Sequence, residues 1–377
     1  MDFILDLAGY TVDRPLHDMR LLEPSFGAGD FLLPAIERLL AAWRSAQSAG
    51  SVVDALSDAI CAVELHHETF FATRVEVIER LKLEGISTQD ALALVERWLV
   101  AGDFLLVPLD GQFDFVVGNP PYVRQELIPA ALLAEYRARY QTLYDRADIY
   151  IPFIEHSLSL LAASGHLGFI CADRWMKNRY GGPLRRLVAD GFHLKIYVDM
   201  VDTPAFHSEV IAYPAITVIS REATGATRIA HRPAIDRVTL AMLADALRVK
   251  HLPQEAGPVR EVARVANGAE PWLLESSDQM ALIRRLEKHF PSLEAVGCKV
   301  GIGVATGADR AFIGDLDALD VEPDRKLALA TTRDILSGEV QWRGLGVINP
   351  FADGGGLVDL REYPRLCRYL EARRAVI

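Results

Sequence analysis

The feature that most constrains this fold is a repeated alternation of short apolar strands with amphipathic helices over the first 220 residues. Apolar residues recur at helical spacing over 31–46, 66–82, 88–99 and 148–163. Strands are predicted between these helices, at 21–22, 58–64, 113–118, 165–171, 194–199 and 211–220. Because strand–helix–strand crossovers make neighbouring strands parallel, we expect an α/β fold with a doubly wound, mostly parallel sheet.

Length and composition narrow the class of protein. The 377 residues are 50% apolar, which is enough for two domains with buried cores. No apolar run of membrane-spanning length appears, and the first residues lack the basic flank of a secretory signal. The four cysteines are scattered without a CxxC pair, which indicates neither a zinc site nor a disulfide framework. We therefore expect a cytoplasmic protein with no metal and no membrane partner.

The pattern of elements changes after Ser220. Residues 221–265 are locally basic and contain prolines, and the stretch that begins near 295 is typical of strand–turn–strand. We predict three parts: a domain over 1–222, a basic connecting region over 223–290, and a second unit over 291–377. The net charge of −11 argues weakly against a nucleic-acid partner, because such proteins usually present a basic surface.

A glycine-containing turn follows the first predicted strand. Its sequence runs Glu23-Pro24-Ser-Phe-Gly27-Ala-Gly29, with an acid at the strand end. A carboxylate there would repel a phosphate but suit a cation, and the two glycines would let the backbone approach a ligand. S-adenosylmethionine carries both an ammonium and a sulfonium, so its methionine end fits this turn. The alternative is an ordinary strand-to-helix turn with a solvated glutamate.

Acidic residues end the next two strand segments as well. Glu64 is placed to accept hydrogen bonds from two ribose hydroxyls, as an acid does in dinucleotide folds. Asp103 can accept a bond from an adenine amine while Phe104 packs on the ring. Each residue taken alone could be a surface side chain. Since ligands bind at the carboxyl ends of parallel strands, the three acids together predict one cofactor site.

The segment Asn119-Pro120-Pro121-Tyr122 directly follows the strand at 113–118. Two acceptors, the Asn119 side-chain oxygen and the Pro120 carbonyl, could hold the two N–H bonds of an adenine N6 amine. Successive prolines fix the backbone, so the acceptors are aimed before the substrate arrives. Tyr122 offers a flat face for a base, which must leave the duplex to reach it. The alternative is a tight structural turn.

These motifs, in this order, resemble the gamma-class DNA adenine methyltransferases of restriction–modification systems. The likeness covers about 20–220 and, more loosely, 295–315. It implies the class I fold of S-adenosylmethionine-dependent methyltransferases, a catalytic domain over 1–222, and double-stranded DNA as partner. It further implies that Phe153 packs near the cofactor and that Phe206 holds the face of the flipped base opposite Tyr122.

Two departures from the family pattern concern the cofactor site and the target-recognition domain. Family members usually begin with a short Thr-Pro segment that closes the cofactor site, whereas this sequence starts at what would be the next helix. The stretch from Tyr363 resembles the middle of a target-recognition domain. We expect residues 291–377 to form a partial recognition domain, with a second subunit as the partner that would complete the site.

Three other functions remain open. Methyltransferases that modify a glutamine of a release factor also use this tetrapeptide, although their glycine loop usually opens with Asp and they lack a large C-terminal region. Cytosine N4 is another acceptor, with Ser commoner than Asn at position 119. A catalytically silent DNA-binding subunit is the alternative of another class. Cytosine C5 chemistry is disfavoured, because it needs a thiol nucleophile.

Overall fold

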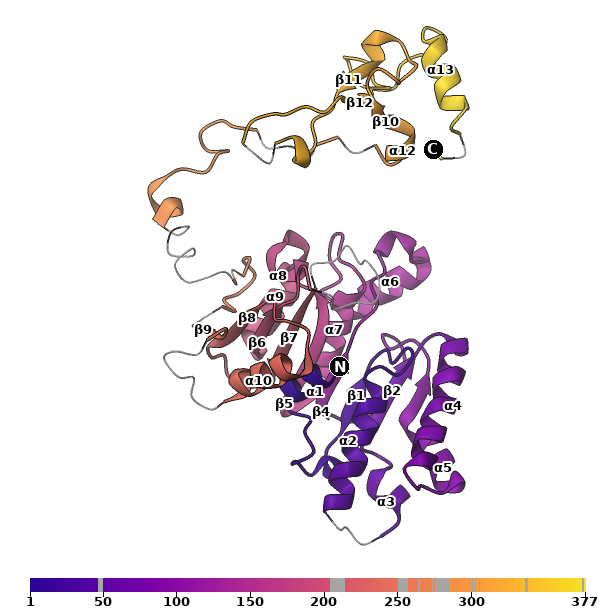
Figure 1. The fold of residues 1–377 in the computed structure, drawn as a ribbon, viewed down its shortest axis with the longest axis vertical. Coiled ribbons are helices and arrows are strands. Elements are labelled where there is room, and N and C mark those ends of the chain that lie inside the picture. Colours follow the sequence, from indigo (N-terminus) through magenta and orange to yellow (C-terminus); the bar gives the residue numbers. More distant parts are fainter. Residues whose placement is uncertain are drawn as a thin grey trace. The chain divides into compact units, whose positions relative to one another are not determined.

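The computed structural model describes residues 1–46, 50–203, 214–249, 257–263, 265–272, 274, 282, 285–299, 301, 303–304, 306–335, 338–374 and 376–377. The chain divides into two compact units, Met1–Arg284 and Arg285–Ile377 (Figure 1). No helix among the described residues is both long and apolar enough to cross a membrane.

A nine-stranded sheet forms the centre of the first unit, in the order β3-β2-β1-β4-β5-β7-β6-β8-β9 (Figure 1). The strands are β1 Leu21–Glu23, β2 Ile60–Glu64, β3 Leu99–Ala101, β4 Phe113–Gly118, β5 Leu161–Ala172, β6 His193–Asp199, β7 Pro214–Ser220, β8 Thr227–His231 and β9 Arg260–Val262. Pairing is parallel from β3 to β5 and between β6 and β8, and antiparallel where β7 and β9 join. The expected doubly wound, mostly parallel sheet is confirmed.

Two apolar clusters cover the two faces of this sheet. Successive residues of β4 belong to different clusters, because side chains alternate across a strand: Phe115 and Val117 to one, Val116 to the other. The helices are α1 Asp2–Ala8, α2 Leu32–Ser45, α3 Val52–Leu56, α4 His67–Leu83, α5 Thr88–Trp98, α6 Ala130–Arg139, α7 Tyr150–Ser159, α8 Arg174–Lys177, α9 Gly182–Gly191 and α10 Arg237–Arg248. The first five helices and α10 bury residues in the first cluster, and α6 to α9 in the second.

The helix predicted over 148–163 is shorter than expected. It ends at Ser159, and β5 begins at Leu161. Leu161 pairs with Phe113 of β4, and the Phe113 amide donates to the Leu160 carbonyl at 2.9 Å. Sheet pairing with a distant strand therefore overrides the local helical pattern.

Part of the predicted connection over 223–290 continues the sheet instead. β8, α10 and β9 all lie within it, and most residues of β8 are buried. The local basicity was misleading because Arg228 is neutralised inside the fold. Its guanidinium is 3.2 Å from the Glu261 carboxylate and donates to the Leu247 carbonyl at 2.9 Å.

The second unit holds a three-stranded antiparallel sheet in the order β10-β12-β11. Its elements are α12 Asp309–Phe312, β10 Ile313–Asp315, β11 Lys326–Ala328, β12 Leu345–Ile348 and α13 Pro364–Glu371. Its core cluster includes Leu319, Val321, Ile348 and Leu366. The stretch predicted as strand–turn–strand, 296–313, lies partly outside the described residues; its described residues include α12 and end at Ile313, the first residue of β10.

The packing of Trp98 provides a test of the first apolar cluster. Its side chain is fully buried, and its indole N–H donates to the Leu56 carbonyl at 2.8 Å. We expect Trp98→Ala to lower the free energy of unfolding by about 3–5 kcal/mol, because it leaves a cavity and an unpaired carbonyl. Leu92, on the same helix and 41% exposed, is the control, and Leu92→Ala should change it by less than about 0.5 kcal/mol. Urea unfolding measures both, and equal effects would contradict this packing.

Candidate cofactor and target-base site

The predicted site residues gather at one edge of the sheet. β1, β2, β3 and β4 are parallel neighbours, so their carboxyl ends meet there. A cavity of about 260 Å³ opens at this edge. Its lining includes Pro24 and Pro121 from the two motifs but not Glu23, Asn119 or Tyr122. The lining residues are Pro24, Ser25, Glu64, Leu65, His66, Gly102, Asp103, Phe104, Pro121, Val123, Leu127, Ile128, Pro129, Leu132, Tyr136, Ile149 and Phe153.

The turn after β1 requires its glycines. Gly27 and Gly29 have φ values of 51° and 85°, in the left-handed region where a Cβ is strained. The Gly27 carbonyl accepts a hydrogen bond from the Thr73 hydroxyl at 2.7 Å, which ties the turn to α4. A Cβ added to Gly27 would meet no atom within 4 Å, so this backbone faces open space. A ligand can approach it closely.

Glu64 links the turn to the end of β2. One carboxylate oxygen accepts from the Gly27 amide at 2.9 Å and the other from the His66 amide at 2.8 Å. The side chain is only 3% exposed, so these two bonds fix its position. Each carboxylate oxygen accepts more than one bond, which leaves capacity for ribose hydroxyls.

Two acceptors at this edge are buried without a partner among the described residues. They are one carboxylate oxygen of Glu23 and the side-chain oxygen of Asn119. Burial raises the pKa of Glu23 well above its ordinary value, and the negative charges of Asp30 and Glu64 add to the effect. An unpaired buried acceptor is costly, so both atoms are suited to a ligand that carries hydrogen-bond donors or positive charge.

The residues that carry these two acceptors lie at the ends of neighbouring strands. A Cβ on Gly118, the residue before Asn119, would lie 3.7 Å from Pro24 and 4.0 Å from Glu23. β4 pairs directly with β1, Leu22 opposite Val116, which forces this approach. The carboxylate suited to a cation and the amide suited to an amine therefore lie at adjacent strand ends.

Aromatic side chains form one wall of the cavity. Phe104, predicted to pack on an adenine ring, is 2% exposed, and its ring centroid lies 5.0 Å from that of Phe153. Asp103 accepts a hydrogen bond from the Leu105 amide at 2.9 Å and another from the Tyr136 hydroxyl. Tyr136 on α6 was missed by sequence reasoning, because nothing around it marks a ligand. It fixes the carboxylate that is predicted to bind the adenine amine of the cofactor.

The tetrapeptide predicted to be catalytic, 119–122, directly follows β4. Pro120 is buried, whereas Tyr122 remains 36% exposed beside the cavity. The Tyr122 ring centroid lies 6.0 Å from that of the fully buried Tyr150, and the Ile149 amide donates to the Val123 carbonyl at 3.1 Å. The start of α7 thus contacts this loop through one aromatic pair and one backbone hydrogen bond. Phe206, the other predicted stacking residue, lies outside the described residues.

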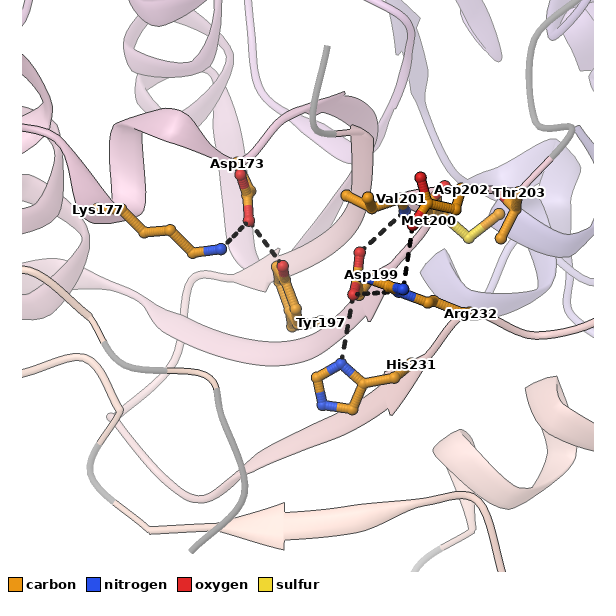
Figure 2. Close-up of polar contacts among 10 residues, drawn as sticks. All are labelled: Asp173, Lys177, Tyr197, Asp199, Met200, Val201, Asp202, Thr203, His231 and Arg232. Atoms are coloured by element: carbon orange, nitrogen blue, oxygen red, sulfur yellow. Dashed lines mark hydrogen bonds and ion pairs between the residues drawn. The ribbon is translucent and has the colours of Figure 1, made fainter. Parts of the chain in front are cut away.

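Sequence reasoning also missed Asp173, which follows β5 at the same edge. It is 2% exposed, and one carboxylate oxygen lies 2.7 Å from the Lys177 amine and 2.8 Å from the Tyr197 hydroxyl (Figure 2). β5 pairs in parallel with β4, the strand that Asn119 follows, so this buried acid lies at the same edge of the sheet as Asn119. Its neighbours Ala172 and Arg174 give no motif that would have revealed it. No group of three or more metal-ligating side chains occurs in the part of the chain that the structure describes.

The fold is that of the class I S-adenosylmethionine-dependent methyltransferases. One solved structure with it is a modification subunit of a putative type I restriction enzyme from Vibrio vulnificus, with a TM-score of 0.53 and 11% identity over 78% of this chain and 60% of that one. At that identity the likeness shows the fold alone. The fold agrees with the sequence prediction.

Sequence comparison gives the family. A model described as Eco57I restriction-modification methylase matches residues 58–206. The chain is 52% identical to the Type II methyltransferase M.XhoI of Xanthomonas vasicola, over 98% of this chain and 69% of that protein. It is 76% identical to the Type II methyltransferase M.PaeR7I of Pseudomonas aeruginosa, over 100% of this chain and 66% of that protein. The chain belongs to this family of Type II restriction–modification methyltransferases, which confirms the resemblance.

Fold and family imply S-adenosylmethionine as the cofactor, as predicted. The residues present fit it. The unpaired carboxylate oxygen of Glu23 suits its cationic methionine end, and the fixed Glu64 carboxylate suits its ribose. The paired rings of Phe104 and Phe153 suit its adenine.

Glu23 makes a pH-dependent prediction. Since burial raises its pKa, the protonated form stabilises the fold fully below the ordinary glutamate pKa of about 4.3. This stability is lost as pH rises through the raised pKa, with a slope of at most about 1.4 kcal/mol per pH unit. Binding of the cationic cofactor should strengthen over the same window, because only the ionised form attracts it.

Urea unfolding and calorimetric titration with S-adenosylmethionine at several pH values measure both effects. Glu23→Gln should remove this component of each pH dependence and weaken cofactor binding. Glu68→Gln, at an exposed position nearby, is the control. Unchanged pH profiles in Glu23→Gln would refute the assignment of the buried carboxylate.

Proposed function

We propose that this chain transfers the methyl group of S-adenosylmethionine to the N6 amine of adenine in double-stranded DNA, within a restriction–modification or related defence system. The observation that carries the proposal is the buried, unpaired side-chain oxygen of Asn119, at the strand end adjacent to that of Glu23, which keeps one buried, unpaired carboxylate oxygen. The Asn119 oxygen can accept a hydrogen bond from an amine, and the Glu23 carboxylate can bind a cation. Direct methyl transfer needs those two groups side by side.

Binding and orientation provide the catalysis in this proposal. The Asn119 side chain and the Pro120 carbonyl accept the two N–H bonds of the amine, which turns the nitrogen lone pair toward the cofactor. Bound S-adenosylmethionine supplies an electrophilic methyl group on sulfur. Tyr122, exposed beside the cavity and supported by Tyr150, stacks on the base after it leaves the duplex. No covalent intermediate and no dedicated base are needed, since positioning lowers the barrier.

Recognition of the DNA is assigned to the C-terminal part. We propose a catalytic domain over 1–222, a connecting region over 223–290 that contributes β8 and β9 to the catalytic sheet, and a partial recognition domain over 291–377. The chain spans 66% and 69% of the lengths of the two relatives. We further propose that more of the same polypeptide, or a second subunit, completes the DNA-recognition surface. We also propose that the protein is cytoplasmic.

Asn119→Ala tests the proposal. Loss of an acceptor aimed at the reacting amine should lower kcat by about 100- to 1,000-fold. Cofactor affinity and the urea midpoint should stay near the wild-type values, because the side-chain oxygen has no partner within the described protein. The assay follows labelled methyl groups from S-adenosylmethionine into genomic DNA, and nucleoside analysis identifies the product as N6-methyladenine.

Other products would support other functions. Label in protein, at a glutamine, would favour the release-factor activity, and N4-methylcytosine would change the base. A chain that holds duplex DNA but never binds S-adenosylmethionine would be a silent subunit. Near wild-type turnover by Asn119→Ala would refute the catalytic role.

A further inference from the structure

The glycine turn after β1 is held on both sides of Gly27. The Gly27 amide donates to a carboxylate oxygen of Glu64 at 2.9 Å, and the Gly27 carbonyl accepts from the Thr73 hydroxyl at 2.7 Å. Glu64 is 3% exposed and Thr73 is 2% exposed, so both bonds are largely shielded from water. Both polar backbone groups of Gly27 are therefore bonded to buried side chains.

These two bonds determine the backbone conformation at Gly27. The amide belongs to the rigid peptide plane before the Cα, and the carbonyl belongs to the plane after it. The rotations of these two planes about the Cα are φ and ψ, so holding both planes fixes both angles, here with φ at 51°. A Cβ on Gly27 would meet no atom within 4 Å. The two bonds thus keep this open side of the turn in one orientation.

Helix α4, which carries Thr73, contacts the turn at two further points. The Phe70 ring centroid lies 5.8 Å from that of Phe26, and both side chains are buried. A Cβ on Gly29 would lie 3.1 Å from a methyl carbon of Thr73, and Gly29 has φ 85°, so a larger residue would be both crowded and strained. Phe70 and Thr73 lie one helical turn apart, on one face of α4. That face packs along the turn from Phe26 to Gly29.

The first residues of α4 adjoin the acid that is predicted to bind the ribose. The N-cap of the helix is His66, and its amide donates to Glu64 at 2.8 Å. Glu64 lines the cavity together with Pro24 and Ser25 of the glycine turn. The turn and the ribose acid are thus joined directly, by the bond from Gly27 to Glu64, and a second time through α4.

We infer that Thr73 is a positioning residue that makes the cofactor site selective for the methionine end of S-adenosylmethionine. The inference rests on the proposed function, which takes the turn and Glu23 to bind that end. The Thr73 hydroxyl contacts no ligand. It holds the peptide plane after Gly27, so the turn has its binding conformation before the cofactor arrives, and less entropy is lost on binding. The adenine end is held by Asp103 and Phe104 and does not depend on this bond.

Thr73→Val tests the inference in the full chain, because valine keeps the branched shape but lacks the hydroxyl. We expect the dissociation constants of S-adenosylmethionine and S-adenosylhomocysteine to rise by about 5- to 30-fold, the cost of ordering one released residue on binding. Methylthioadenosine shares the adenosine and the sulfur but lacks the amino-acid end. Its dissociation constant should change by less than about twofold. Calorimetric titration measures all three constants.

Three further variants separate the hydroxyl from the packing. Thr73→Ser retains the hydroxyl and should bind all three ligands as the wild type does. Thr73→Ala lacks the hydroxyl without placing a methyl group against the Gly27 carbonyl, so it should show the selective loss even if Thr73→Val does not fold. Thr69→Val is the matched control, since it makes the same change one turn earlier on α4. It should leave all three constants unchanged.

Two results would overturn the inference. One is an unchanged affinity for S-adenosylmethionine in Thr73→Val and Thr73→Ala. The other is an equal loss of affinity for methylthioadenosine, which would show that the substitution damages the whole site. Failure of the proposed function would instead appear in the wild type. A wild-type chain that binds S-adenosylmethionine selectively but forms no N6-methyladenine would refute the proposed DNA activity and leave the role of Thr73 intact.

Discussion

Parallel pairing of β4 with β1 is the constraint on which the site depends. It places Leu21 and Leu22 opposite Phe115 and Val116, so both strands end at the same level. Glu23 is the last residue of β1, Asn119 directly follows β4, and a Cβ on Gly118 would lie 4.0 Å from Glu23. Both side chains keep a buried acceptor without a partner among the described residues. Such atoms oppose folding, and the apolar clusters on both faces of the sheet offset their cost.

The surrounding residues restrict motion more than they supply chemistry. Glu64 fixes the glycine turn through one amide and the end of β2 through another, and Tyr136 fixes Asp103. Each hydrogen bond is modest alone, yet together they place the ligand-facing atoms before any ligand binds. Methyl transfer without a covalent intermediate depends on such placement, because the reaction needs aligned reactants rather than an activated side chain.

The local sequence pattern was sufficient to predict a site residue where that residue marks the end of a strand and also has a suitable chemical group. An acid or an asparagine directly after an apolar strand marks the carboxyl edge, and the structure places Glu23, Glu64, Asp103 and Asn119 there. The pattern was insufficient where partners are distant in sequence. Tyr136 looks like any amphipathic-helix residue, and Asp173 gains meaning only from Lys177 on α8 and Tyr197 on β6.

The sequence by itself determined the strand–helix alternation, the strand ends that carry polar groups, and the chemistry of those groups, because side-chain periodicity and residue type are local properties. Tertiary structure decided which strand ends are neighbours, that β8 and β9 extend the sheet beyond the predicted boundary, and that helix α7 ends before β5. It also decided which acceptors remain unpaired. Burial and pairing are properties of the whole chain, since each depends on residues that meet only after folding.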